Sequence, residues 1–412
     1  MTKAGFIGLA FVTALAAAAT ARADQPGTVY HIRPDNLPKP YATSSAVNPS
    51  TRTYRPEGIP LKVTSGFQVN LFAEDLTHPR NILAASDGTV FLAESKADKI
   101  TILKDRDGDG HTDYSGSYVT GANRPHGLAL HAGYLYFADL DGIWRIAWQP
   151  GSMKPSTAPK MISQEDALGG TGGHWTRNIA FSPDGNWLYA SIGSRSNIGE
   201  EPIPRASIQR FKVHPDGRVS SRQTFAYGLR NPVGIAFKPG TNDLYTVVNE
   251  RDGMGDGLVP DYFTHVQDGG FYGWPYAYIG SHPMPGYSDK RPDLVKEAII
   301  PDVLFEAHSA SLGFTFLDKA DVPEDWKDDA LVALHGSWNA ARATGYKVVR
   351  VPFEDGKPTG EYIDFLTGFR LNPGKPGQAA VWGRPVALTV MPDGSILVSD
   401  DAGGTIWRIS RK

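Results

Sequence analysis

A strand–turn–strand unit recurs along this chain of 412 residues, and it restricts the possible folds more than any other feature. Residues 178–192 show the unit most clearly: an apolar run, a Pro-Asp-Gly turn, and a second apolar run that ends in small residues. Further strand-sized pieces extend each copy, and successive copies begin about 45–80 residues apart. The six copies cover residues 61–104, 127–148, 178–213, 234–249, 313–351 and 386–409.

This repeat predicts an all-β protein, a six-bladed β-propeller of four-stranded antiparallel blades. A β-sandwich is the alternative, but its strands would not recur as four-stranded units. We expect residues 61–73 to lie beside the last strand and close the ring, because closure removes an open sheet edge. The 45 glycines, 31 prolines and 11% aromatic residues suit many short strands joined by tight turns.

Residues 1–23 have the features of a secretory signal peptide: Lys3, an apolar run at 5–20, and Ala-Arg-Ala at 21–23. A transmembrane anchor is the alternative, but the run is short and ends at a small-residue cleavage site. We therefore expect a periplasmic or secreted protein with no membrane span after cleavage.

The region after the signal peptide is rich in Pro, Ser, Thr and Tyr and has no clear period. Residues 24–60 are expected to form an extended arm that either wraps the domain or is disordered. Residues 61–412 are expected to form the propeller domain that carries the site.

Composition excludes several classes of protein. The formal net charge of −3 gives no reason to expect nucleic acid or an anionic membrane surface as a partner. The chain has no cysteine, so it forms no disulfide and cannot attach c-type haem covalently. Any electron acceptor must therefore be an external one.

Residues 105–113 read Asp-Arg-Asp-Gly-Asp-Gly-His-Thr-Asp and match the front of a calcium-binding loop. Gly116 replaces the usual bidentate glutamate, so a further ligand is expected from elsewhere. The site would be structural, because the loop joins strands at a blade edge; the alternative is a solvated acidic turn. The carboxylates that would hold the ion belong to Asp105, Asp107, Asp109 and Asp113.

His174 follows the run Gly-Gly-Thr-Gly-Gly at 169–173, where glycine allows the backbone to approach a ligand closely. A neutral imidazole with a pKa near 6.5 suits a general base near neutral pH. His174 is therefore a candidate catalytic residue; the alternative is a structural histidine whose hydrogen bonds are satisfied.

Two polar segments flank the fourth unit. Arg230 provides a fixed cation that suits a carboxylate-bearing ligand, with a salt bridge between blades as the alternative. Residues 249–256, Asn-Glu-Arg-Asp-Gly-Met-Gly-Asp, are rich in oxygen ligands and glycine. They suit a second calcium ion held partly by backbone carbonyls.

Five motifs in one order resemble the glucose/sorbosone dehydrogenase family. They are Leu-Arg-Asn-Pro-Val-Gly-Ile-Ala-Phe at 229–237, Asn-Glu-Arg-Asp-Gly at 249–253, Gly-Gly-Phe-Tyr-Gly-Trp-Pro at 269–275, His-Ser-Ala-Ser-Leu-Gly at 308–313 and His-Gly-Ser-Trp-Asn at 335–339. The resemblance extends over about residues 66–410 and is closest to the L-sorbosone dehydrogenase branch. It implies a secreted six-bladed propeller that uses pyrroloquinoline quinone (PQQ) with calcium.

The resemblance also implies roles for individual residues. His174 matches the catalytic base, and Asp252 and Gly253 match positions whose carbonyls hold the active-site calcium. Two positions depart from the glucose enzymes. Ser194 stands where those enzymes have the aspartate that orients the base, and Asn339 lies near the position of their cofactor-binding lysine. The positions that match or lie near cofactor-binding residues are Arg230, Asn231, Arg384, Asn339, His126 and Arg80.

The implied reaction is oxidation of a sugar or sugar-derived aldehyde, of the L-sorbosone or aldose type. His174 would take the hydroxyl proton while hydride passes to PQQ, and calcium would polarise the quinone. The electrons would leave to an external acceptor such as a periplasmic cytochrome or quinone.

Two alternatives remain open. One is a non-catalytic propeller that binds glycans or protein partners. The other is a metal-dependent lactonase, whose centre would need Glu94, Asn178, Asn231 and Asp400.

Overall fold

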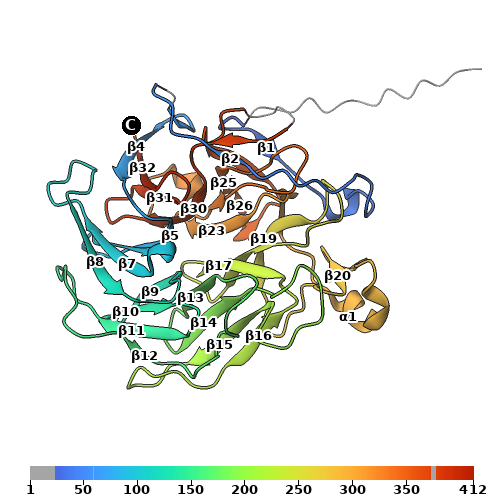
Figure 1. Ribbon diagram of the computed structural model, residues 1–412, viewed down its shortest axis with the longest axis horizontal. Helices are drawn as coiled ribbons and strands as arrows, with labels where there is room; N and C mark the ends of the chain where they lie inside the picture. The colour runs from blue at the N-terminus through green and yellow to red at the C-terminus, as the bar shows by residue number, and fades with distance from the viewer. Residues whose placement is uncertain (1–23, 59, 373–376) are drawn as a thin grey trace, which may run out of the picture.

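The computed structural model describes residues 24–58, 60–372 and 377–412, which form six antiparallel blades around a central axis (Figure 1). The predicted six-bladed β-propeller is therefore confirmed. The predicted signal peptide, residues 1–23, lies outside the described residues. Within those that are described, no helix is long and apolar enough to cross a membrane.

Each blade runs from an inner strand beside the axis to an outer strand at the periphery. Blade one contains β5 (Pro79–Ala84), β6 (Val90–Glu94), β7 (Lys99–Lys104) and β8 (Tyr114–Thr120). Blade two contains β9 (Gly127–His131), β10 (Tyr134–Ala138), β11 (Ile143–Ala147) and β12 (Lys160–Met161). Blade three contains β13 (Arg177–Phe181), β14 (Trp187–Ile192), β15 (Ser207–Lys212) and β16 (Gln223–Tyr227). Blade four contains β17 (Asn231–Phe237), β18 (Leu244–Asn249), β19 (Pro260–Val266) and β22 (Val303–Ala307). Blade five contains β23 (Ser311–Phe316), β24 (Ala330–Leu334), β25 (Lys347–Val351) and β28 (Tyr362–Thr367). Blade six contains β30 (Pro385–Val390), β31 (Ile396–Asp400), β32 (Thr405–Arg411) and β4 (Phe67–Ala73).

Short elements lie outside this pattern. The arm contributes β1 (Val29–Tyr30), η1 (Pro34–Asn36), β2 (Thr51–Arg52) and β3 (Lys62–Val63). The connections contribute η2 (Ser95–Ala97), β20 (Ala277–Tyr278), β21 (His282–Pro283), η3 (Ser288–Lys290), α1 (Pro292–Glu297), η4 (Glu324–Trp326), β26 (Phe353–Glu354), β27 (Lys357–Pro358) and β29 (Ala380–Val381).

The second strands of the blades are nearly continuous apolar runs because neighbouring blades cover both of their faces. All five residues of β24, Ala-Leu-Val-Ala-Leu, are buried. The inner strands approach one another closely at glycines. A Cβ on Gly127 of β9 would lie 2.4 Å from the Arg177 carbonyl of β13, and one on Gly313 of β23 would lie 2.7 Å from the Val386 carbonyl of β30. Only glycine allows this spacing around the axis.

The ring closes where β4 pairs with β32, from Phe67 opposite Arg411 to Ala73 opposite Ile406 (Figure 1). This confirms the expected closure, although the preceding segment, β3, pairs with β28 of blade five instead. The first repeat unit of the sequence includes β4 besides strands of blade one, and the units omit β8, β12, β16, β19, β22 and β28. Three of these strands, β8, β12 and β16, are short or half-exposed, and polar residues hide the alternation: β8 reads Tyr-Ser-Gly-Ser-Tyr-Val-Thr. The other three, β19, β22 and β28, are mostly buried and lie beyond the ends of the expected units.

The described residues of the arm, 24–58 and 60, run over the propeller surface. β1 adds to the outer edge of blade five by pairing with β28, and β2 pairs in parallel with β29. Asn48 donates hydrogen bonds from Nδ2 to the carbonyls of Ala340 and Gly377, at 2.9 and 3.1 Å. These contacts bring the arm to the rim of the central cavity.

Candidate active site

A cavity of about 620 Å³ opens on one rim of the propeller, where the inner strands begin. Turns between strands of several blades form its walls, and the arm contributes Ser50 and Arg52. The residues of the predicted site that line it are His174, Arg230, Asn231, Arg384, Asn339, Arg80 and Asp252. They are far apart in the sequence, and the propeller brings them together because each lies at the same end of its blade.

The imidazole of His174 is held through its Nδ1 atom, which lies 2.9 Å from the Ser194 carbonyl and 3.1 Å from the Ser194 Oγ. A carbonyl only accepts, so Nδ1 carries the proton and Nε2 bears the lone pair of the neutral ring. Ser194 Oγ donates to the Ser196 carbonyl at 2.6 Å, and Glu201 accepts from the Ser196 amide and hydroxyl. Ser194 therefore orients His174 mainly through its backbone, where the glucose enzymes use an aspartate.

His174 stays neutral over a wide pH range. Burial, followed by the charge of Arg230, lowers the pKa of His174 to about 4. The hydrogen bond to Ser194 opposes this shift but does not reverse it. The ring is thus an acceptor at neutral pH, which is what a general base needs.

Arg230 has its guanidinium occupied by the protein. Nε donates to the Asn197 carbonyl at 3.1 Å, and Nη1 donates to the carbonyls of Asn249 and Glu250 at 3.2 and 2.6 Å. Nη2 donates to Asn197 Oδ1 at 2.9 Å and to Asp252 Oδ2 at 3.1 Å. Arg230 therefore positions the 249–252 segment and supplies charge, but it has no free donor for a ligand carboxylate.

One wall of the cavity is acidic and contains Glu250, Asp252 and Asp261. Burial raises the pKa of Glu250 to about 8 and that of Asp261 to about 6. Burial also acts to raise the pKa of Asp252, but hydrogen bonds and the charge of Arg230 bring it below its ordinary value. A bound cation would favour the ionised forms of all three groups.

Asn339 links this wall to blade five. Its Nδ2 donates to Asp252 Oδ1 at 2.7 Å and lies 3.2 Å from His308 Nδ1. His308 Nε2 in turn lies 3.0 Å from the Gly255 carbonyl. Asn339 thus contacts the acidic wall through a neutral amide. The lysine that the glucose enzymes have near this position would add a positive charge there.

The opposite wall centres on Asp401, whose side chain is buried and contacts one arginine and two histidines. Arg80 Nη1 lies 2.6 Å from its Oδ2, and His335 Nε2 lies 2.8 Å from its Oδ1. Arg384 donates to the carbonyls of His335 and Gly336 at 3.0 and 2.7 Å. Arg80 and Arg384 are therefore on the cavity wall as expected, but both are tied to protein acceptors.

Two predicted residues do not line the cavity. His126 is buried behind Trp175, with ring centroids 5.5 Å apart, and both of its ring nitrogens are without hydrogen-bond partners in the described part of the chain. Gly253 is also absent from the wall, and the neighbouring Asp252 carbonyl accepts a hydrogen bond from Asn197 Nδ2 at 2.9 Å. That hydrogen bond uses one lone pair of the carbonyl oxygen and leaves the other for a calcium ion.

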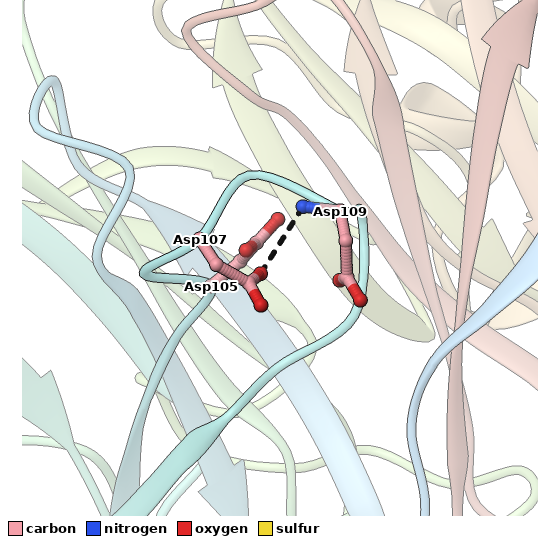
Figure 2. Close-up of side chains that lie close together, drawn as sticks. All are labelled: Asp105, Asp107 and Asp109. Atoms are coloured by element: carbon pink, nitrogen blue, oxygen red, sulfur yellow. Dashed lines mark hydrogen bonds between the residues drawn. The ribbon is translucent and has the colours of Figure 1, made fainter.

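The loop predicted to bind calcium joins β7 to β8, at the end of blade one away from the cavity. Figure 2 shows the carboxylates of Asp105, Asp107 and Asp109 gathered within the loop, with oxygen atoms within 4.8 Å of one another. Asp105 accepts from the amides of Gly108 and Gly110 at 2.7 and 2.9 Å. Asp113 is not part of this group; its nearest cation is Arg106, at 3.9 Å.

Several functional candidates were not assigned from the sequence. Asn197, Lys96 and Arg124 lie in turns whose composition gives no signal. Glu250, His308 and His335 belong to the quoted motifs, which would have pointed to them had each polar residue been considered separately.

The family described as TrAA12-like matches residues 61–259 and 289–412. The chain belongs to the TrAA12-like family. This confirms the resemblance to the PQQ-dependent soluble sugar dehydrogenases, while the L-sorbosone branch stays a prediction. The segment between the two matched ranges includes β19, β20 and β21.

Relatives of this TrAA12-like protein include a curated PQQ-dependent pyranose dehydrogenase from Coprinopsis cinerea, 26% identical over 85% of this chain. The alignment spans 54% of that enzyme, so the chain covers about half its length. The holo PQQ domain of C. cinerea pyranose dehydrogenase is 23% identical, with a TM-score of 0.73 over 88% of this chain and all of that one. A calcium structure of the Trichoderma reesei family AA12 enzyme is 19% identical, with a TM-score of 0.71 over 89% of this chain and 99% of that one. At these identities the two structures support the fold.

Proposed function

We propose that this protein is a sugar oxidoreductase that uses PQQ and calcium, with His174 as the general base. The observation that carries the proposal is the buried His174, fixed through Nδ1, with Nε2 available on the wall of a cavity that has one acidic and one cationic side. The names of the C. cinerea and T. reesei relatives support the choice of PQQ, calcium and a carbohydrate substrate.

The donor set fits the cofactor pair. Six Lys or Arg and four Asp or Glu residues line the cavity, a formal excess of two positive charges in a chain whose net charge is −3. PQQ carries three carboxylates, which suit this excess, and the acidic wall suits a dication. Asn231 Oδ1 is buried without a hydrogen-bond partner among the described residues, so it can accept from a ligand.

In the proposed reaction, the protein binds a sugar with one C–H bond directed at the cofactor and its hydroxyl directed at His174. When bound, PQQ with calcium would supply the hydride acceptor. His174 Nε2 takes the hydroxyl proton, and Ser194 keeps the ring in the tautomer that can do so. Burial of the site excludes water from the proton transfer. The substrate is of the aldose or L-sorbosone type, and an external acceptor takes the electrons.

The lactonase alternative lacks its metal centre. Asp400 accepts from the amides of Arg384 and Gly403 at 2.7 and 2.8 Å, which makes it a cap for the turn after β31. Glu94 accepts from the Thr77 amide and pairs with Lys99 at 2.9 Å. Neither carboxylate lines the cavity.

The test is titration of metal-stripped protein with PQQ, with and without calcium, followed by dye reduction with L-sorbosone and D-glucose. We expect calcium-dependent binding and turnover. Binding of sugars without turnover would instead support a glycan-binding propeller, and no PQQ binding at micromolar concentration would exclude the proposal.

The pH dependence follows from the lowered pKa of His174. A base must be unprotonated, so kcat/KM should hold as pH falls from 7 and then drop through about pH 4, rather than through the ordinary 6.5. Circular dichroism at each pH distinguishes this drop in kcat/KM from acid unfolding. A limb near pH 6.5 in folded enzyme would contradict the assignment.

We also propose that the 105–109 loop binds a structural calcium ion. Calcium added to metal-stripped protein should then raise its Tm, because an ion that binds only the folded state stabilises it. Asp107→Asn keeps the Oδ1 acceptor for the Asp109 amide but removes a charge, so it should lose part of that rise. Asp355→Asn, on an exposed turn, is the matched control. An equal rise in both variants would place the ion elsewhere.

A further inference from the structure

Three cations on the cavity wall, Arg52, Lys96 and Arg124, make no ion pair or side-chain hydrogen bond with the described residues, and two of them share one corner. Lys96, in η2 between β6 and β7, and Arg124, in the loop before β9, both line the cavity. Over the residues that the structure places, neither side chain makes an ion pair or a hydrogen bond; Arg124 lies only against Trp175, with its guanidinium carbon 4.3 Å from the ring centroid. This contrasts with Arg230, whose guanidinium nitrogens all donate to protein acceptors. Arg80 and Arg384 are intermediate, since each donates to a protein acceptor but keeps a guanidinium nitrogen without one among the described residues.

Both cations lie close to His78, which gives an independent indication that they share one corner of the cavity. Burial lowers the pKa of His78 to about 4, and the charges of Arg80, Lys96 and Arg124 contribute to that shift against the opposing charge of Asp401. His78 Nε2 lies 3.3 Å from Asp401 Oδ2, so the proton belongs on Nε2. Its Nδ1 is then a buried acceptor without a partner in the described ranges.

This corner therefore presents positive charge and one unused acceptor, His78 Nδ1. Lys96 and Arg124 together offer eight N–H donors, three from the ammonium and five from the guanidinium. Lys96 is exposed and Arg124 is half-buried at the mouth of this corner, and an anion between them would be attracted by both charges. A carboxylate matches the planar fork of arginine, and a neighbouring hydroxyl would satisfy the His78 nitrogen.

We propose that Lys96 and Arg124 bind a carboxylate group of the ligand that occupies the cavity. The inference rests on the proposed function and extends it, because the carboxylate has two sources. It belongs either to the quinone cofactor, which is a tricarboxylate, or to an acidic sugar substrate such as a hexuronate. In both cases the anion is held by cations other than Arg230, whose donors are occupied by the protein.

The experiment compares wild-type protein, Lys96→Met/Arg124→Met, and the control Lys154→Met, which removes an exposed lysine away from the cavity. Isothermal titration measures the affinity of each protein for PQQ in the presence of calcium, for D-glucuronate and for D-glucose. Because both cations lack protein partners, the double variant should fold, and circular dichroism with the Tm checks this.

We expect the double variant to lose about 10- to 100-fold in affinity for one carboxylate probe, as for other charge-assisted hydrogen bonds, while the control and D-glucose binding do not change. A loss confined to PQQ assigns the pair to the cofactor, and a loss confined to D-glucuronate assigns it to an acidic substrate. Unchanged affinity for both probes, or no binding of either to the wild type, overturns the inference. The proposed function is judged separately, by calcium-dependent turnover of the wild type.

Discussion

Replacing His174 by alanine is expected to lower sugar oxidation by about 10²- to 10⁴-fold, the range that a positioned general base contributes. Its side chain provides the buried acceptor on the cavity wall, and Ser194 fixes its ring. Removing the imidazole leaves the acidic and cationic walls in place, so PQQ and calcium should still bind. The measurement is kcat with saturating PQQ and calcium, together with the absorbance of the bound quinone.

The matched control is His214→Ala, since His214 is exposed in the turn after β15. It should leave both binding and kcat as in the wild type. If the His174 variant binds PQQ and still turns over at the wild-type rate, another residue is the base. If it loses PQQ as well, His174 acts in cofactor binding, and its role as base is not supported.

Replacing Lys347 by methionine is expected to lower the free energy of unfolding by about 3–5 kcal/mol, the cost of leaving a buried partner charge unpaired. Lys347 is completely buried, and its Nζ lies 2.7 Å from Asp364 Oδ1 and 3.6 Å from Asp24 Oδ1. It also lies 4.3 Å from the ring centroid of Tyr30. One lysine thus joins blade five to the start of the arm, and its loss leaves Asp364 buried without its cation.

Equilibrium unfolding by urea, or calorimetry at fixed pH, measures this effect. Lys154→Met, at an exposed site, is the control and should change little. The double variant Lys347→Met/Asp364→Asn should recover part of the loss, because it removes the unpaired charge. A single variant as stable as the wild type would show that water or local rearrangement replaces the ion pair.

The fold could be predicted because its signal is repeated six times. Inner and second strands are apolar on both faces, and the turn residues between them recur, so each copy supports the others. Outer strands carry no such signal: β12 is only Lys160–Met161, and its pairing with β11 depends on tertiary context. The position of the arm was equally open, since it depends on two-residue strand pairings and on side-chain contacts such as those of Asn48.

The site was predictable where a residue lies at the start of an inner strand or within a distinctive motif. His174, Arg230 and Arg384 satisfy this condition, and the structure brings all three to one cavity. What they contact could not be deduced, because the partners are backbone carbonyls from other blades. Arg230 was expected to have donors to spare, yet Asn197 and Glu250 occupy them. Lys96 and Arg124 differ in the opposite direction: they were not expected at the site, and their charged groups have no ion-pair partner among the described residues.

Closure of the ring by β4 and β32 has a consequence for biogenesis. β4 precedes the other blades in the sequence and β32 follows them, so the last blade cannot assemble until residues 405–411 have been synthesised. Until then β4 and β31 each present an unpaired edge, which is a template for association with other chains. A nascent chain of this kind benefits from being kept unfolded until β32 has been synthesised. Truncation before Thr405 would therefore yield aggregates rather than a shortened propeller.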